Sequence, residues 1–418
     1  MFTRIQANGY KSLLSVDQRL SPFCALVGPN ASGKTSFLDC IGVLSDVMKC
    51  GDMQNAMRMR SDNFQDLTWC GKGRAFKLAV EASIPREVAQ KIADERFRDE
   101  SNVRYEIEIG EDANGVLGIN AETLWLTTWF EKNDRQLSFF PELQKEEVSP
   151  FWKSRKDRKI LVRKTATERD RYDPEGKPTY KPVFKLGRQK SALAHLPAEW
   201  DAFPVSTWFK DWLATGVQQL VLNSQRIRMP CPYTSNIKFM PDGSNLPWVV
   251  HELREKDDEK FQQWLEHIQT ALPDVRDIST VIRQEDRHCY LCVHYLNGAV
   301  VPSWLVSDGT LRLLALTVPA YLRGFDGVYL VEEPENGVHP NAVETVVQSL
   351  SSIYDGQVIM ATHSPIVLNL VPTKDIICFA KDSQGATDVV AGDRHPRLQQ
   401  WKRGNPDIGT LFASGVLC

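Results

Sequence analysis

The stretch Gly28-Pro29-Asn30-Ala31-Ser32-Gly33-Lys34-Thr35 decides what fold the rest of the chain can form. Its spacing, G-x-x-x-x-G-K-[ST], is that of a loop whose glycines let successive backbone N–H groups face phosphates. Lys34 would meet the β- and γ-phosphates, and Thr35 would offer its hydroxyl to Mg²⁺. We therefore predict that these residues, together with Ser36, bind a nucleotide with Mg²⁺.

The residues on both sides of this loop have the pattern that a phosphate-binding loop requires. The apolar run Phe23 to Val27 precedes it and predicts a strand, and the apolar-periodic stretch Lys34 to Met48 predicts a helix. The N-terminus of such a helix presents free N–H groups and the positive end of its dipole to an anion. A chance glycine turn before a helix is the alternative, and the flanks argue against it.

The C-terminal part of the chain, from about residue 303, alternates between helical and strand patterns. This alternation predicts a largely parallel sheet with helices on its faces. The predicted elements are a helix at Thr310 to Leu322, a strand at Gly327 to Val331, a helix at Asn341 to Ile353, and strands at Gln357 to Ala361 and Asp375 to Phe379.

Two carboxylates follow one of these predicted strands, in Val328-Tyr329-Leu330-Val331-Glu332-Glu333-Pro334. A parallel strand delivers its C-terminal end to the ligand crevice, so Glu332 is placed to support Mg²⁺ and Glu333 to orient or activate a water molecule. Glutamate in the first position, rather than the commoner aspartate, lengthens the arm by one methylene group. An apolar strand that simply meets solvent is the alternative, which the order relative to the phosphate loop disfavours.

Two further segments indicate a function only because of where they lie relative to the phosphate loop and the two carboxylates. Ser307-Asp308-Gly309-Thr310 opens a predicted helix, where small residues leave an anion site; alone it is a good N-cap. Ala361-Thr362-His363-Ser364-Pro365 puts a histidine at a strand end, where a lone histidine is usually structural.

In chain order these segments closely resemble the ATP-binding-cassette (ABC-type) ATPases of the RecF, SMC and OLD kind. The resemblance rests on the phosphate loop, Ser307-Asp308-Gly309, the run from Val331 to Pro340, and Thr362-His363-Ser364-Pro365. It covers residues 1–45 and 225–390. Asp242-Gly243-Ser244-Asn245-Leu246-Pro247 also looks like a segment that stand-alone members carry before the Ser307 segment, which is their signature.

The resemblance implies roles for individual residues. Ser307 and Gly309 would contact the γ-phosphate of ATP held by the opposite protomer, and His363 would be the switch histidine at that phosphate. Glu335-Asn336-Gly337 with His339 would form the loop that meets its symmetry mate. A glutamine would join Thr35 and Glu332 at the metal, with Gln65 as the better-spaced candidate and Gln54 as its rival.

The resemblance also implies that each ATP site is composite, with the phosphate loop and carboxylates from one head and the signature helix from another. A ligand that bridges two heads stabilises only the closed state, and hydrolysis then releases it. We therefore expect self-association, as a head-to-head dimer or a higher oligomer.

Composition sets broader bounds. The 418 residues are 42% hydrophobic and 25% charged, with a net charge of −3, and no segment approaches the roughly 20 apolar residues of a membrane span. The N-terminus lacks a signal-peptide pattern, and the nine cysteines lack the paired spacing of a disulfide framework. We therefore expect a cytoplasmic protein with free thiols.

The expected fold class is α/β: an ABC-type P-loop NTPase head with an inserted β-rich subdomain and a helical lid. We expect residues 1–50 and 301–418 to form the head, 51–224 to form a β-meander and helical insertion, and 225–300 to form a lid. Strand patterns between residues 50 and 300 lie at Phe76 to Ile84, Tyr105 to Ile109 and Leu124 to Phe130, and helical patterns lie at Trp208 to Leu222 and Asp258 to Leu272.

Two further sequence features, a basic stretch and a C-x-x-C run, each allow two interpretations. Residues 153–190 carry 14 Lys/Arg against 5 Asp/Glu with interspersed aromatic residues, which suits nucleic acid or a partner protein, or a solvated hairpin turning at Asp173-Pro174-Glu175-Gly176. The run from His288 to His294 contains one C-x-x-C and invites zinc, but Cys289 and Cys292 would point to opposite faces of a strand, so structural cysteines are favoured.

These observations predict an ATPase that drives or gates a separate effector, a nuclease or toxin, in DNA handling or antiphage defence. The 39 residues that follow the last predicted strand are too few for the toprim nuclease of OLD proteins. One alternative is a low-turnover, nucleotide-gated scaffold that restrains a toxin or nuclease. Another is a RecF-like DNA repair ATPase.

Overall fold

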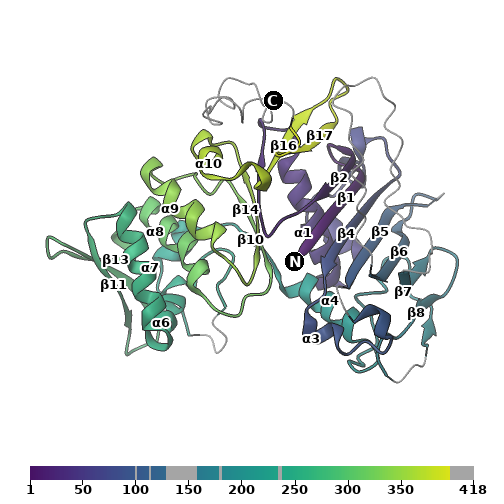
Figure 1. The fold of residues 1–418 in the computed structure, drawn as a ribbon, viewed down its shortest axis with the longest axis horizontal. Helices are drawn as coiled ribbons and strands as arrows, with labels where there is room; N and C mark the ends of the chain where they lie inside the picture. The colour runs from purple at the N-terminus through teal and green to yellow at the C-terminus, as the bar shows by residue number, and fades with distance from the viewer. Residues whose placement is uncertain (99–100, 113, 129–157, 178–180, 234–237, 396–418) are drawn as a thin grey trace.

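The computed structural model describes residues 1–418 except 99–100, 113, 129–157, 178–180, 234–237 and 396–418. Figure 1 shows two halves that meet at a central sheet: one holds a large antiparallel sheet, and the other holds a group of helices with a small sheet. None of the helices in the described part of the chain has the length and apolarity of a membrane span.

The central sheet has six strands and confirms the predicted α/β core. Five strands run parallel, and the last, at one edge, is antiparallel. Across the sheet the order is β10 (Val217–Leu220), β14 (Val328–Glu332), β15 (Gln357–Thr362), β3 (Phe23–Val27), β16 (Ile376–Lys381) and β17 (Thr387–Ala391). All six residues of β15 are buried, as is typical of a parallel strand covered on both faces.

The second sheet has eight antiparallel strands and joins the N-terminal hairpin to the predicted insertion. Its order is β2 (Leu13–Arg19), β1 (Phe2–Tyr10), β4 (Ala75–Ser83), β5 (Asn102–Glu111), β6 (Leu117–Thr127), β7 (Arg158–Thr165), β8 (Asp170–Tyr172) and β9 (Val183–Phe184). The sheet therefore crosses the expected boundary at residue 50, and β10, which also lies before residue 224, belongs to the central sheet instead.

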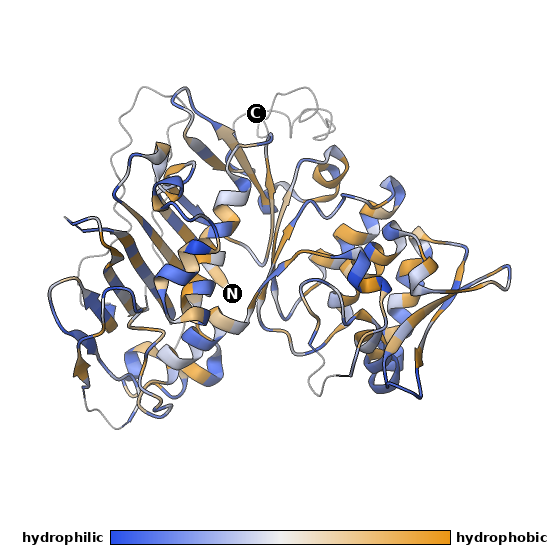
Figure 2. Ribbon diagram, turned by 180° about the vertical axis from the view of Figure 1, so that it is seen from behind, coloured by the Kyte–Doolittle hydropathy of each residue, from blue (hydrophilic) through white to orange (hydrophobic). Residues whose placement is uncertain are grey.

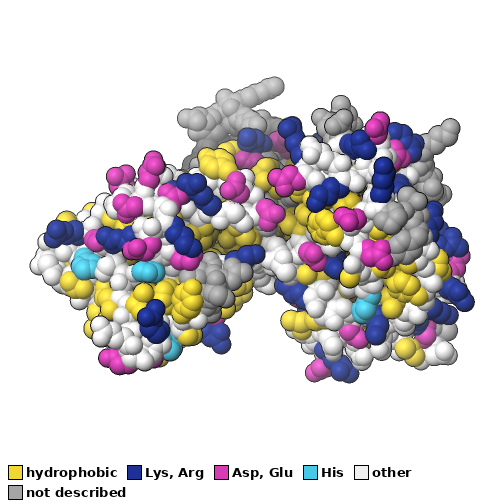
Figure 3. Space-filling model, turned by 90° about the horizontal axis from the view of Figure 1, so that it is seen from below, with side chains coloured by type: hydrophobic (Ala, Val, Ile, Leu, Met, Phe, Trp, Pro, Cys, Tyr) yellow, Lys and Arg dark blue, Asp and Glu magenta, His cyan; other side chains and the backbone are white. Residues whose placement is uncertain are grey.

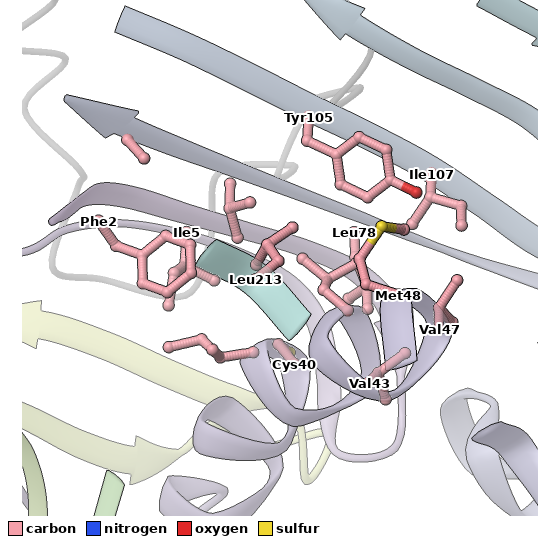
Figure 4. Close-up of a cluster of buried hydrophobic side chains, with 14 of the residues drawn as sticks. Phe2, Ile5, Cys40, Val43, Val47, Met48, Leu78, Tyr105, Ile107 and Leu213 are labelled. Atoms are coloured by element: carbon pink, nitrogen blue, oxygen red, sulfur yellow. The ribbon is translucent and has the colours of Figure 1, made fainter. Parts of the chain in front are cut away.

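Helix α1 (Lys34–Cys50) lies between these two sheets, and its apolar residues contact both. Toward the central sheet, Phe37 meets Phe379 edge-on with ring centroids 5.4 Å apart. Toward the large sheet, Figure 4 shows a shared cluster of side chains from α1, from the large sheet and from α4, namely Cys40, Val43, Val47, Met48, Phe2, Ile5, Leu78, Tyr105, Ile107 and Leu213. Since α1 begins at the phosphate loop, this burial fixes the position of that loop.

The other half is built from helices packed on a small sheet. The sheet contains β11 (Val275–Ile282), β12 (Cys289–Tyr295) and β13 (Val300–Pro302). The helices are α5 (Ser224–Arg228), α6 (Leu246–Lys256), α7 (Asp258–Ala271), α8 (Asp308–Thr317), α9 (Pro340–Ser351) and α10 (Pro365–Leu370). In Figure 2 apolar and polar residues alternate along these helices, and their buried faces join the central sheet in one core. The remaining helices, α2 (Met53–Arg58), α3 (Arg86–Ala89) and α4 (Pro204–Thr215), belong to the half with the large sheet.

Two helix predictions are wrong at their C-terminal ends. The predicted helix Trp208 to Leu222 stops at Thr215; after Gly216 the chain becomes β10, because pairing with β14 outweighs local helical periodicity. The predicted helix Thr310 to Leu322 corresponds to α8, which ends at Thr317. A short 3-10 helix follows because Pro319 cannot donate a backbone hydrogen bond.

Gln357, at the start of β15, ties the central sheet to the N-terminal strand. Its fully buried side chain accepts a hydrogen bond from Phe2 N (2.8 Å) and donates to Phe2 O (2.8 Å) and Ser21 O (2.9 Å). Buried polar groups that lose such partners incur their full desolvation cost.

We expect Gln357→Leu to lower the free energy of unfolding by about 2–4 kcal/mol, because three hydrogen bonds are lost and Phe2 keeps buried unpaired groups. Urea unfolding followed by circular dichroism measures the change. The control Gln384→Ala, at an exposed turn, should change stability by less than about 0.5 kcal/mol. Equal stability of Gln357→Leu and the unchanged protein would contradict this role.

Candidate nucleotide site

The phosphate loop joins β3 to α1 as the sequence predicts. Gly33 is the N-cap of α1 with φ 107°, and no side chain caps the helix, so its first N–H groups remain available to an anion. Lys34 is buried, and its Nζ donates to Gly28 O (2.7 Å) and Pro29 O (2.8 Å). The side chain of Lys34 thus lies along the phosphate loop, where it is predicted to bind the β- and γ-phosphates.

Thr35 and Glu332, which are far apart in sequence, meet at the C-terminal edge of the parallel strands. Thr35 Oγ1 donates to Glu332 Oε2 at 2.6 Å, and Gln219 Nε2 donates to Glu332 Oε1 at 3.2 Å. Hydroxyl and carboxylate oxygens are ligands that Mg²⁺ prefers, so this pair fits the predicted metal. The longer glutamate arm therefore still reaches the threonine.

Gln219 is a residue that sequence reasoning missed, because it was assigned to a helix. It lies on β10, next to β14, and it contacts Glu332 directly. Gln65 lies in a short 3-10 helix (Phe64–Leu67) and does not line the cavity around the phosphate loop, whereas its neighbour Asp66 does. Gln54 lies on α2. A metal-site role for Gln65 stays a prediction.

Glu333 and His363 lie next to each other at the ends of β14 and β15. His363 Nδ1 is 3.1 Å from Glu333 Oε1, and Glu333 N donates to Ala361 O at 2.8 Å. Glu333 has φ 47°, a left-handed conformation that costs a non-glycine residue about 1–3 kcal/mol and that is concentrated at functional sites. The structure thus brings together the two residues predicted to be catalytic.

Glu335 connects the turn after β14 to the switch segment. Its Oε1 accepts hydrogen bonds from Thr362 Oγ1 (2.6 Å) and from His363 N (3.4 Å). The position of His363 therefore depends on the Glu335-Asn336-Gly337 turn of its own chain.

A cavity of about 710 Å³ surrounds the phosphate loop. It is lined by Lys11, Ser12, Asn30, Ala31, Ser32, Gly33, Lys34, Thr35, Ser36, Asp66, Thr68, Cys70, Gly71, Glu332, Glu333, Ala361 and Lys381. Lys11 and Lys381 add positive charge that the motifs did not reveal. Lys11 pairs with Asp39 of α1 at 2.5 Å; burial alone would raise the pKa of Asp39, but Arg60 and Lys11 together hold this pKa below its ordinary value.

The signature segment is well formed but lies away from this cavity. Ser307 caps α8 through a bond from Thr310 N at 3.2 Å, and Arg228 pairs with Asp308. Gly309 lies close to the turn that follows β14 (residues 333–337), here called the carboxylate turn. A Cβ atom on Gly309 would lie 2.9 Å from Gly337 O. Among the described residues, neither Ser307 nor Gly309 lines the cavity around its own phosphate loop.

The basic stretch 153–190 lies partly outside the described residues, and several of its described cations have partners within the chain. Lys159 donates to Pro174 O (2.7 Å), Lys164 pairs with Asp170 (3.3 Å), and Arg188 pairs with Asp112 (2.6 Å). On the face in Figure 3, basic and acidic side chains are intermingled over both halves. A nucleic-acid role for this stretch stays a prediction.

The alternative interpretation of this stretch as a hairpin is partly correct. Strands β8 and β9 pair antiparallel on either side of the turn. The turn is not solvated, however, because Glu175 is fully buried and accepts a hydrogen bond from Ser206 N at 2.6 Å. Burial raises the pKa of Glu175 to about 7.

The C-x-x-C run forms β12 and leads into the neighbouring hairpin. Cys289 is buried against Cys231 and Trp248, and burial raises its pKa to about 12. His294 pairs instead with Ser279, at 2.7 Å. Within the described ranges, no three histidine, cysteine or acidic side chains are grouped as metal ligands.

Gly33 offers a direct test of the loop geometry. With φ 107°, its added Cβ would lie 2.2 Å from Oγ1 of the fully buried Thr387, which itself donates to Ser32 O at 2.9 Å. Gly33→Ala should therefore weaken Mg²⁺-ATP binding by about tenfold or more, since overpacking costs about 1–3 kcal/mol.

Calorimetric titration with ATP and Mg²⁺ measures this change. The control Gly187→Ala, where a Cβ meets nothing within 4 Å, should keep the original affinity. An unchanged affinity in Gly33→Ala would show that ATP does not use this loop.

Comparison with solved structures shows similarity to SMC heads. One is described as the "SmcHead bound to the C-winged helix domain of ScpA": identity is 15%, TM-score is 0.51, and 93% of this chain and 96% of that chain are covered. Another is the Smc head domain with an extended coiled coil bound to the C-terminal domain of ScpA, from Pyrococcus furiosus, with 13% identity, TM-score 0.52, and coverage of 96% and 99%. At these identities the similarity shows the fold alone, an ABC-type head.

A search of curated proteins found no match. One family model does match, over residues 23–369, which run from β3 past the switch segment. Its description is "AAA domain, putative AbiEii toxin, Type IV TA system". Since the match spans most of the chain and includes every motif described above, the protein belongs to this AAA-domain family of P-loop ATPases.

Proposed function

We propose that this protein hydrolyses ATP and uses the cycle to close and open pairs of heads. The observation that carries the proposal is the meeting of Thr35, Glu332, Glu333 and His363 at one edge of the central sheet. This edge combines a phosphate loop, a pair of oxygen ligands for a cation and a carboxylate next to a histidine. Those are the parts that phosphoryl transfer to water requires.

The residues divide the chemistry between them. Lys34 and the N-terminus of α1 bind the phosphates, while Thr35 and Glu332 would hold Mg²⁺. When bound, Mg²⁺ would neutralise charge on the phosphate oxygens. Glu333 would orient the attacking water and accept its proton, and His363, whose Nδ1 lies 3.1 Å from that carboxylate, would act at the γ-phosphate.

The position of the signature supports a site shared between two copies. Ser307 and Gly309 lie at the start of α8 with N–H groups suited to an anion, yet they do not line their own chain's cavity. A second head would bring its signature to the γ-phosphate. ATP would then stabilise the closed pair, and hydrolysis would release it.

The proposed role is to gate a separate effector, a toxin or nuclease, in antiphage defence or DNA handling. The description of the family supports a toxin system, and the SMC head structures are described with a ScpA domain bound. Co-purification with the product of an adjacent gene would identify such a partner.

The variant Glu333→Gln tests the catalytic assignment. It keeps the shape of the side chain but cannot accept the proton, so kcat should fall by about 100-fold or more while ATP binding persists. Phosphate release measures turnover, and titration with ATP measures binding.

Glu344→Gln, at an exposed position on α9, serves as the control and should hydrolyse ATP at the original rate. A Glu333→Gln protein as fast as the unchanged protein would remove Glu333 from the mechanism. Near-silent turnover of the unchanged protein, with ATP stably bound, would instead favour the low-turnover scaffold.

A further inference from the structure

In the turn that follows β14, Asn336 forms two hydrogen bonds with Glu333, one with its backbone and one with its side chain. Asn336 N donates to Glu333 O at 2.9 Å, which closes the turn, and Asn336 Nδ2 donates to Glu333 Oε2. The same residue therefore binds both the backbone and the carboxylate of Glu333.

The two carboxylate oxygens of Glu333 are engaged separately. Oε2 accepts from Asn336, and Oε1 faces His363 Nδ1 at 3.1 Å. A carboxylate has about four lone-pair sites, so two such contacts fix its plane and still leave acceptor sites for a water molecule. Glu333 lines the cavity beside Glu332, and its side chain remains about 37% exposed.

The backbone alone does not determine this orientation. Glu333 has φ 47°, and its N–H is committed to Ala361 O at 2.8 Å, so the main chain is held while the side-chain torsions remain free. The neighbouring Glu335 uses its Oε1 elsewhere, accepting hydrogen bonds from Thr362 and His363. The side-chain amide of Asn336 is thus the donor that fixes the position of Glu333 Oε2.

We propose that Asn336 is a positioning residue for ATP hydrolysis: its side-chain amide orients the Glu333 carboxylate toward the attacking water. This inference rests on the proposed function, because it assigns Asn336 a part in the same reaction. It differs from the role that the family resemblance implies for this turn, which is contact with a symmetry mate. The Asn336–Glu333 contact forms within one chain.

Two substitutions separate this role from a structural one. Asn336→Ala removes the donor, and Asn336→Asp keeps the size and the backbone turn but places a second carboxylate against Glu333. If the amide positions Glu333, both variants lose activity, and Asp is the slower because it repels the carboxylate. If the side chain only shapes the turn, Asp is the faster because it fits the same space.

The experiment measures kcat, KM for ATP, ATP affinity and the thermal midpoint for both variants. We expect kcat to fall about 10- to 100-fold for Asn336→Ala and further for Asn336→Asp, since misplacement of a catalytic group by about 1 Å costs about 100-fold. KM and affinity should stay within about twofold, because Asn336 does not line the cavity. In a Glu333→Gln background, Asn336→Ala should cause no further loss.

The control is Asn55→Ala, an exposed asparagine on α2, which should behave as the unchanged protein. Full activity of Asn336→Ala, or higher activity of Asn336→Asp than of Asn336→Ala, would overturn the inference. Failure of the proposed function looks different: the unchanged protein would then show no hydrolysis that depends on Lys34 and Glu333, whatever residue stands at 336.

Discussion

The site depends on the parallel register of three strands, β3, β15 and β14. Val358–Thr362 pairs with Phe23–Val27, and Glu332 pairs with Ala361, so the three strands end level with one another. For this reason Thr35 and Glu332, 297 residues apart, form a 2.6 Å hydrogen bond. A shift of one residue in the pairing of β14 with β15 would turn Glu332 to the other face of the sheet, away from Thr35.

The burial of α1 between two sheets holds the phosphate loop in place relative to these strands. Its apolar residues contact the central sheet on one side and the large sheet on the other, so α1 cannot move without opening a core. The signature helix, in contrast, belongs to the second half of the molecule and touches the carboxylate turn through Gly309 and Gly337. One chain therefore links the turn beside its own proposed ATP site to the signature that would contact the ATP of a second copy.

The motifs predicted most of the central sheet because their physical signals are local. The strands around the phosphate loop and the carboxylates are short apolar runs that end in turn or charged residues, and they lie where the sequence indicates. Gln219 could not be found in this way. Its strand follows a helix after a single glycine, and only pairing with β14 makes it a strand.

Some contacts could not be predicted from the motifs. Lys11 and Lys381 are far from the phosphate loop in sequence, and no local pattern shows that they line its cavity. Asn336 is only three residues from Glu333, but the side-chain contact between them depends on the geometry of the turn. A count of charges along the basic stretch likewise does not reveal that Lys164 pairs with a buried Asp170, or that Arg188 pairs with Asp112.

The central claim is that a triphosphate bound by one head is completed by the signature of a second copy. Mixing two inactive variants tests it: Lys34→Ala lacks the phosphate contact, and Ser307→Arg blocks the signature. Differently tagged copies that co-purify with ATP demonstrate exchange. If the site is shared, a mixed pair contains one intact site, and random pairing restores about a quarter of the original ATPase rate. If pairs form but the mixture stays as inactive as its components, the claim is contradicted.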